Sequence, residues 1–185
     1  MKKLAVLSVA LLGTGLALAH PHFNKRAVAL LPGLIEASIA YRTVPVNELL
    51  IEKVAVGSFV TPRSPRLTLT GELMAGSTAV PSGTYTLGVI RRGPADWEMV
   101  LYPGRLLRGE EPAREKLIRL ESEFSNAEKN VEHVRIDIIP GQGKFKGKAV
   151  VTMQFGTMLL QGALTYPDVP SPRPDMTPNS DRGHP

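Results

Sequence analysis

The sequence predicts an all-β protein, a single antiparallel β-sandwich of jelly-roll-like or barrel-like form. Apolar and polar residues alternate along several segments, which is typical of strands that place one face on a core. Turns that contain Gly and Pro separate these segments, and no β-α-β alternation of the kind that builds a parallel sheet is present.

The alternating segments follow one another along most of the chain. They are "LIEASIAYR" (34–42), "RLTLTGEL" (66–73), "GTYTLGVI" (83–90), "DWEMVLY" (96–102), "HVRIDII" (133–139) and "KAVVTMQF" (148–155). A further segment, "TMLLQGAL" (157–164), is apolar on both faces and is expected to be a central strand. Gly156 lies between the last two segments, which predicts either a very tight connection or a bulge.

The connections carry turn chemistry. In "VPSG" (80–83) Pro81 stands where a type I turn prefers it and Gly83 at the fourth position, so the chain should bend there before Tyr85. Further breaks are "RRGPAD" (91–96), "YPGR" (102–105) and "PGQGKFKG" (140–147).

Two readings fit "EPAREKLIRLESEF" (111–124). Leu117, Leu120 and Phe124 fit one face of a helix, whereas Ile118, Leu120, Ser122 and Phe124 fit one face of a strand. We favour a short turn followed by a strand that begins at about Leu117.

The two ends of the chain have their own composition. Met1-Lys2-Lys3 precedes an apolar run that closes with Ala17-Leu18-Ala19, which predicts a signal peptide over 1–19. A β-sandwich domain is expected over 20–166. Prolines and polar residues crowd 167–185, which predicts a disordered tail. We therefore expect a periplasmic or secreted protein without a membrane span after cleavage.

Composition excludes several classes of protein. The chain of 185 residues has no cysteine, so disulfides, thiolate metal sites and a cysteine nucleophile are excluded. The formal charge of +5 includes Lys2 and Lys3, so cleavage would leave +3. No stretch mixes basic and aromatic residues as base stacking requires, and no nucleic-acid partner is expected. Arg91, Arg92, Arg105 and Arg108 are interpreted as solvated turn residues.

The segment 80–104 resembles the exported bacterial proteins of the domain of unknown function 2911 family. In that family a turn that contains proline and glycine leads into a strand that contains a tyrosine, and a strand that contains a tryptophan follows after a short loop. The matching residues are Pro81, Gly83, Thr84, Tyr85, Leu87 and Trp97. The start "AHPHFNK", the strand "ASIAYRT" and the ending "HVRIDIIPGQGKFKGKAVVTMQFGTMLL" are also similar, so the resemblance spans about 20–164. It implies a β-rich fold and export, and it implies no chemistry.

The sequence gives little support for an enzyme. No G-x-S-x-G elbow, P-loop, G-x-G-x-x-G or H-E-x-x-H motif occurs. A serine triad would need His133 with Asp137, and we interpret His133 instead as a surface histidine near a strand edge. Glu121 and Glu123, like Glu110 and Glu111, are interpreted as solubilising charges rather than as a glycosidase pair.

The start of the expected mature chain, His20-Pro21-His22, offers the alternative of a copper site. The amine and imidazole of His20 are suitable copper ligands, and His22 or His133 would add a third nitrogen. Pro21 has no amide proton, so the amino-terminal copper motif that uses an amide nitrogen at the second position is blocked. The opposing interpretation is a polar lead-in after which Phe23 packs against the sandwich, with no cofactor.

A binding role is the other class of function. Tyr41, Phe59, Tyr85, Trp97 and Tyr102 are the aromatic residues considered for a ligand surface. Most share the phase of core residues, and Tyr102, next to Pro103, is the best candidate for an exposed position. We expect a non-catalytic binding or interaction module of the cell envelope with a small ligand or an envelope protein as its partner. The alternative is a copper-binding protein or redox enzyme that uses His20.

Overall fold

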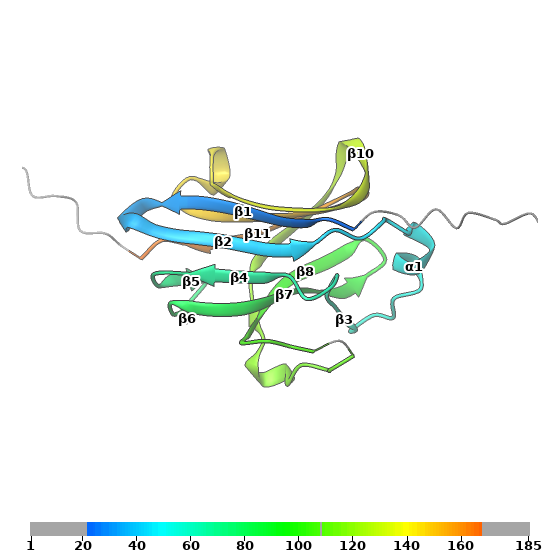
Figure 1. Cartoon of the computed structure of the whole chain (residues 1–185), viewed down its shortest axis with the longest axis horizontal. Helices are drawn as coiled ribbons and strands as arrows, with labels where there is room; N and C mark the ends of the chain where they lie inside the picture. The colour runs from blue at the N-terminus through cyan, green and yellow to red at the C-terminus, as the bar shows by residue number, and fades with distance from the viewer. Residues whose placement is uncertain (1–21, 108, 168–185) are drawn as a thin grey trace, which may run out of the picture.

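The structure is a computed structural model that describes residues 22–107 and 109–167 (Figure 1). Two antiparallel sheets make up the fold, and the predicted all-β sandwich is confirmed. The first sheet contains, in spatial order, β1 (Asn24–Leu31), β2 (Ile35–Arg42), β4 (Arg66–Leu69), β7 (Gly83–Gly93), β8 (Asp96–Pro103) and β9 (Ile118–Arg119), and β3 (Phe59–Val60) also pairs with β7. The second sheet contains β10 (Glu121–Pro140), β11 (Lys148–Thr165), β5 (Leu73–Ala75) and β6 (Thr78–Val80).

Helical structure within the described residues is short. It consists of the α-helix α1 (Glu48–Glu52) and the single 3-10 turns Pro32–Leu34, Arg114–Lys116 and Gly143–Phe145. Among the described residues, no helix has both the length and the apolar character needed to cross a membrane.

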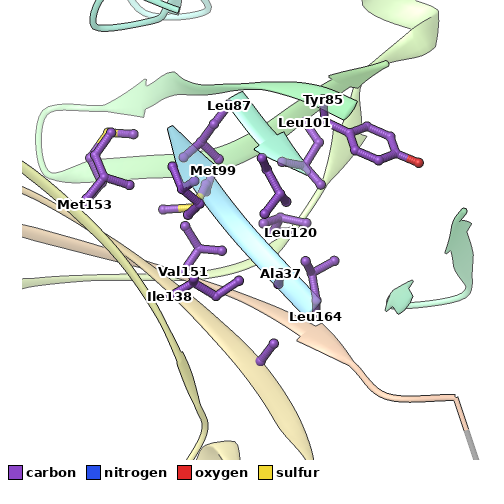
Figure 2. Packing of buried hydrophobic residues seen from close by; sticks show 14 of the residues in the cluster. Ala37, Tyr85, Leu87, Met99, Leu101, Leu120, Ile138, Val151, Met153 and Leu164 are labelled. Atoms are coloured by element: carbon purple, nitrogen blue, oxygen red, sulfur yellow. The ribbon is translucent and has the colours of Figure 1, made fainter. Parts of the chain in front are cut away.

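The core lies between the facing sides of the two sheets. Leu67, Leu87, Met99 and Leu101 of the first sheet, together with Met153 of the second, have no exposed surface. Figure 2 shows core side chains of both sheets pointing toward one another. This is the arrangement that the alternating segments predicted: in β4, for example, Leu67 and Leu69 are buried and their neighbours Arg66 and Thr68 are exposed.

One predicted strand divides between the sheets. The segment 66–73 was expected to be one strand, but β4 belongs to the first sheet and β5 to the second. The chain crosses over at Gly71, where a Cβ atom would lie 2.7 Å from Ile35 Cγ1. Alternation continues through the crossing because Leu69 and Leu73 both face the same core from opposite sides. The pattern therefore could not reveal the change of sheet.

β10 and β11 form a long hairpin with an irregular centre. Gly156 has a φ of 60°, and the register between the strands shifts on either side of its partner Val131. Of the two predictions for Gly156, the bulge is confirmed, and the segments 148–155 and 157–164 form one strand rather than two. In the order of the sheet β11 lies between β10 and β5, but its pairing with β5 is limited to Thr165 and Met74, so within the described residues the segment 157–164, which was expected to be a central strand, pairs with β10 alone.

The segment 111–124 follows the reading that we favoured. A 3-10 turn at Arg114–Lys116 precedes β9, and β10 begins at Glu121. Leu120 donates its N–H to the Met99 carbonyl between the two strands. The chain thus passes from β9 of the first sheet through Leu120 into β10 of the second sheet.

Tyr85 stabilises the bend that joins the sheets before β7. The chain bends at Ser82, and Gly83 has a φ of 154°, which is a conformation that favours glycine. The Tyr85 hydroxyl donates a hydrogen bond of 2.6 Å to the Pro81 carbonyl. Pro81, Gly83 and Tyr85, three of the residues on which the family resemblance rests, therefore have a structural role at this corner.

Loops cover part of the outer side of the first sheet. Gly88 leaves room for the Phe59 ring, which directly overlies it. Thr86 lies two residues before Gly88 on the same outer face of β7. Its hydroxyl donates to the Gly104 carbonyl and accepts from the Leu106 N–H. The contacts of Thr86 explain why it is buried although it points away from the core.

The predicted signal peptide over 1–19 and nearly all of the predicted tail over 167–185 lie outside the described residues. The strands described here all fall within the range 20–166 expected for the sandwich domain.

Candidate functional site

An apolar crevice opens between the two sheets at the end of the sandwich where α1 lies. One wall consists of Ile51, Val54, Val60, Val89 and Trp97. The opposite wall consists of Phe124, Met153, Phe155, Met158 and Leu160. The crevice is narrow, with a cavity volume of about 50 Å³; the space around it that is open to solvent brings the total empty volume to about 430 Å³. Every lining side chain is apolar, so the crevice is suited to an apolar group.

Local sequence explains the helix that borders the crevice. Asn47 caps α1, and its side-chain oxygen accepts a hydrogen bond of 3.3 Å from the Leu50 N–H. Ile51 is half-buried and packs against the core, whereas Leu49 and Leu50 are exposed. The single helical turn therefore directs one apolar side chain into the crevice.

Arg91 fixes this border to the first sheet. Its guanidinium donates to the carbonyls of Glu52 at 2.7 Å and Val54 at 2.6 Å, and its Nε donates to Gly93. The same guanidinium lies 5.7 Å from the centre of the Trp97 ring. The interpretation of Arg91 as a solvated turn residue is therefore wrong: the residue is half-buried in β7 and has structural contacts.

The mouth of the crevice is polar. A shallow hollow lined in part by Glu48, Glu52, Arg91 and Thr157 adjoins the crevice and shares Trp97 with it. A ligand bound in the crevice would leave its polar end near these side chains. Trp97 is 9% exposed, so it contributes a ring face to the interior and remains accessible from the mouth.

The predicted aromatic candidates separate into two groups. Tyr41, Tyr85 and Trp97 are buried, as expected from their phase. Tyr102 is half-buried on the outer side of the first sheet, opposite Thr86 of β7, and is not among the residues that line the crevice. Phe59 is also half-buried, because its ring covers Gly88.

The predicted metal-binding histidines are partly described. His20 lies outside the described residues. His22 is exposed, and its Nδ1 lies 3.0 Å from the carbonyl oxygen of Thr43. Pro45, two residues after Thr43, forms an isolated antiparallel bridge with His133. The buried Nε2 of His133 has no hydrogen-bond partner among the described residues. The fold thus brings His22 and His133 to the same short segment, 43–45.

Other expectations about this region need correction. Phe23 does not pack into the sandwich, since 54% of it is exposed; its N–H donates to the Thr43 hydroxyl instead. His133 is a half-buried residue rather than a surface one. The Asp137 carboxylate accepts a hydrogen bond of 2.8 Å from the N–H of the next residue in its strand, Ile138.

A buried carboxylate lies on the outer side of β8. Glu98 is 8% exposed and pairs with Arg92 at 3.4 Å and with Arg119. Arg92 also lies 3.8 Å from Asp96, so this residue, which is exposed as its interpretation as a solvated residue requires, has two carboxylate partners. A carboxylate held between two arginines is satisfied structurally, and we assign it no chemistry.

Sequence reasoning missed the crevice. The signals available were the aromatic and methionine residues in 153–158 and the short helix within 47–54, but neither indicates that the two meet. A scan against protein-family models found no match to this chain, and searches of curated proteins and of solved structures found none either. The resemblance to the domain of unknown function 2911 family stays a prediction.

Proposed function

We propose that the protein is an exported, non-catalytic binding protein of the cell envelope, periplasmic or secreted, that takes a slender apolar ligand into the crevice. The observation that supports this proposal is the continuous apolar lining between the sheets. Cores are normally packed closely, and apolar space at the end of a sandwich is a common place for a ligand. An acyl chain is the ligand class that fits this chemistry.

The energetics favour an unbranched ligand. Each buried methylene contributes about 0.8 kcal/mol, so a chain of several carbons gains substantial affinity without a polar contact. Met153 and Met158 are unbranched and flexible, which lets the walls adjust to the width of the chain. The polar end of the ligand would remain in water at the mouth, where Arg91 lies beside Glu48 and Glu52.

The chain carries its own reporter for such binding, since Trp97 is its single tryptophan and lines the crevice. A bromine-bearing fatty acid quenches tryptophan at short range. We expect saturable quenching of Trp97 by this probe in the full chain after export. No quenching, or quenching that rises without saturation, would contradict the proposal.

A pair of variants separates the crevice from the surface. Val54→Phe adds a ring to a half-buried residue of the lining, whereas Val56→Phe adds the same ring to a residue that is 65% exposed in the same loop. We expect V54F to weaken the affinity for the probe, as measured by quenching, by about tenfold or more, because the probe would have to displace the new ring from the crevice. V56F should leave quenching unchanged. Equal behaviour of the two variants would place the probe elsewhere.

Copper binding is the second candidate, and the histidine geometry supports it. If Nδ1 of His22 carries the proton donated to the Thr43 carbonyl, Nε2 is free for a metal, as in many histidine metal sites. Within the described ranges, no three His, Cys, Asp or Glu side chains converge, so His20 would have to complete the site. Native mass spectrometry of the untagged exported protein tests this: bound copper that is lost in His20→Ala supports the candidate, and a metal-free mass after copper addition contradicts it.

A further inference from the structure

A second groove, separate from the crevice, lies where the chain enters β4. Its polar lining consists of Thr61, Arg63, Ser64, Arg66 and Arg105, and we call it the arginine groove. It is wide and open, with a volume of about 690 Å³. It shares no lining residue with the crevice, so the inference drawn from it does not rest on the proposed function.

The arginine groove carries an excess of positive charge, although the Glu110 carboxylate accepts a hydrogen bond of 2.8 Å from the N–H of the lining residue Leu107. No carboxylate lines it, and among the described residues Arg63, Arg66 and Arg105 have no Asp or Glu within ion-pair distance. Arginines elsewhere on the same sheet are paired, as Arg26 with Glu36 and Arg119 with Glu98 show. Three like charges that share one concavity repel each other, and an anion would relieve that repulsion.

The backbone of one wall is held in an unfavourable conformation. Arg63 has a φ of 60° and Ser64 a φ of 49°, and neither is glycine. Each left-handed residue of this kind costs about 1–2 kcal/mol, and such strain concentrates at ligand clamps. Prolines on both sides, Pro62 and Pro65, further restrict the segment.

Contacts to a single residue of β7 keep this segment in place. The Thr61 hydroxyl donates to the Leu87 carbonyl at 2.9 Å, and the Leu87 N–H donates to the Pro65 carbonyl at 2.9 Å. Both ends of 61–65 are therefore clamped to Leu87, which is fully buried. The position of the Arg63 backbone is fixed before any ligand arrives.

The opposite wall is anchored in a similar way. Arg105 lies between Gly104 and Leu106, both of which bond to the buried Thr86 hydroxyl at 2.9 and 3.1 Å. Arg66 is the register partner of Thr86 on β4. The three arginines thus extend from backbone that is fixed around two adjacent buried residues of β7. A prearranged set of charges costs less to organise on binding than a flexible one.

We propose that the arginine groove binds a ligand that carries phosphate groups. A guanidinium presents paired N–H donors that match the oxygens of a phosphate, and three of them suit a group with several negative charges. The open shape accommodates a ligand larger than inorganic phosphate. The phosphate group belongs either to a soluble molecule or to a lipid headgroup, and both present the same chemistry to the groove.

Calorimetry with pyrophosphate tests the proposal on the full exported chain. We expect binding that weakens as salt rises from about 50 to 200 mM, because exposed ion pairs are screened. The triple variant R63Q/R66Q/R105Q should lose about tenfold or more in affinity, since each charge-assisted hydrogen bond from an arginine to the pyrophosphate contributes to the binding free energy. The matched triple variant K129Q/R135Q/K146Q removes the same charge from exposed residues of the β10–β11 hairpin and should change affinity by less than about twofold.

A vesicle arm distinguishes the two sources of phosphate. Vesicles of phosphatidylglycerol are compared with vesicles of phosphatidylcholine in a sedimentation assay, with both triple variants. Pyrophosphate binding that depends on the groove supports a soluble ligand, and groove-dependent binding confined to phosphatidylglycerol supports a lipid headgroup. Equal losses in the two triple variants would show general charge attraction, and binding to neither probe would remove the basis for the site. Either of these results overturns the proposal.

Discussion

The corner at Tyr85 provides the sharpest test of how this sandwich is held together. Tyr85→Phe removes the hydroxyl that donates to the Pro81 carbonyl at 2.6 Å and leaves the ring in the core. Loss of such a bond costs about 1 kcal/mol net. A larger cost is not expected, because Pro81 is exposed and its carbonyl gains a water in the variant.

Urea unfolding followed through Trp97 fluorescence measures this change. With a slope of about 2 kcal/mol/M, a loss of about 1 kcal/mol lowers the unfolding midpoint by about 0.5 M. Tyr102→Phe is the matched control, because Tyr102 is half-buried and no hydrogen bond of its hydroxyl is found among the described residues. Its free energy of unfolding should change by less than about 0.5 kcal/mol. If the two variants shift the midpoint equally, the hydroxyl does not stabilise the corner.

Alkaline pH gives the same variant a second signature. Burial, and secondly the nearby Glu72 carboxylate, raise the pKa of Tyr85 above its ordinary value. The neutral phenol is therefore favoured in the folded state, and this stabilisation is complete below the unfolded pKa, about 10. It is lost as pH rises through the higher folded pKa. We expect the stability gap between the wild-type protein and Y85F to narrow above pH 10; a gap that stays constant would refute this account.

The remaining predictions concern the β10–β11 hairpin. Gly156→Ala should lower the free energy of unfolding by about 1–2 kcal/mol, because a φ of 60° is unfavourable with a Cβ, and chemical denaturation measures it. Gly143→Ala is the control, because Gly143 has a φ of 57° and its Cβ would have no neighbour within 4 Å. A larger loss of stability in G156A than in G143A measures the cost of the contact with Glu48 Oε1, which would lie 2.6 Å from the new Cβ. His133→Phe removes a buried Nε2 that has no hydrogen-bond partner among residues 22–107 and 109–167, and it should leave the free energy of unfolding unchanged or raise it by up to about 1 kcal/mol. A marked loss of stability in H133F would mean that this nitrogen is satisfied in solution.

Local patterns predicted the strands because each strand reports its own burial. Ile35, Ala37, Ile39 and Tyr41 lie on one face of β2 and all four are buried, whereas the other face carries Glu36, Ser38 and Arg42. The same logic correctly assigned Trp97 to an interior position and favoured a turn and a strand over a helix at 111–124. These features depend on residues close in sequence, which is why the sequence alone was sufficient for them.

Pairing between distant segments was beyond that logic. Alternation across Gly71 does not distinguish one strand from two that face each other, because Leu69 and Leu73 enter the same core either way. Arg91 was assigned to solvent because its partners, the carbonyls of Glu52 and Val54, lie almost forty residues earlier in the chain. A backbone acceptor leaves no mark in the sequence.

The sequence by itself determined the all-β class, the inner face of most strands, the tight corner at Tyr85 and the absence of disulfides. Tertiary structure alone decided the two candidate sites. The crevice exists because Ile51 of a one-turn helix meets Met158 of β11, and the arginine groove exists because Arg63 and Arg105 are both held against β7. Burial is encoded residue by residue along a strand, whereas a cavity is created by the way that separate segments fail to fill the space between them.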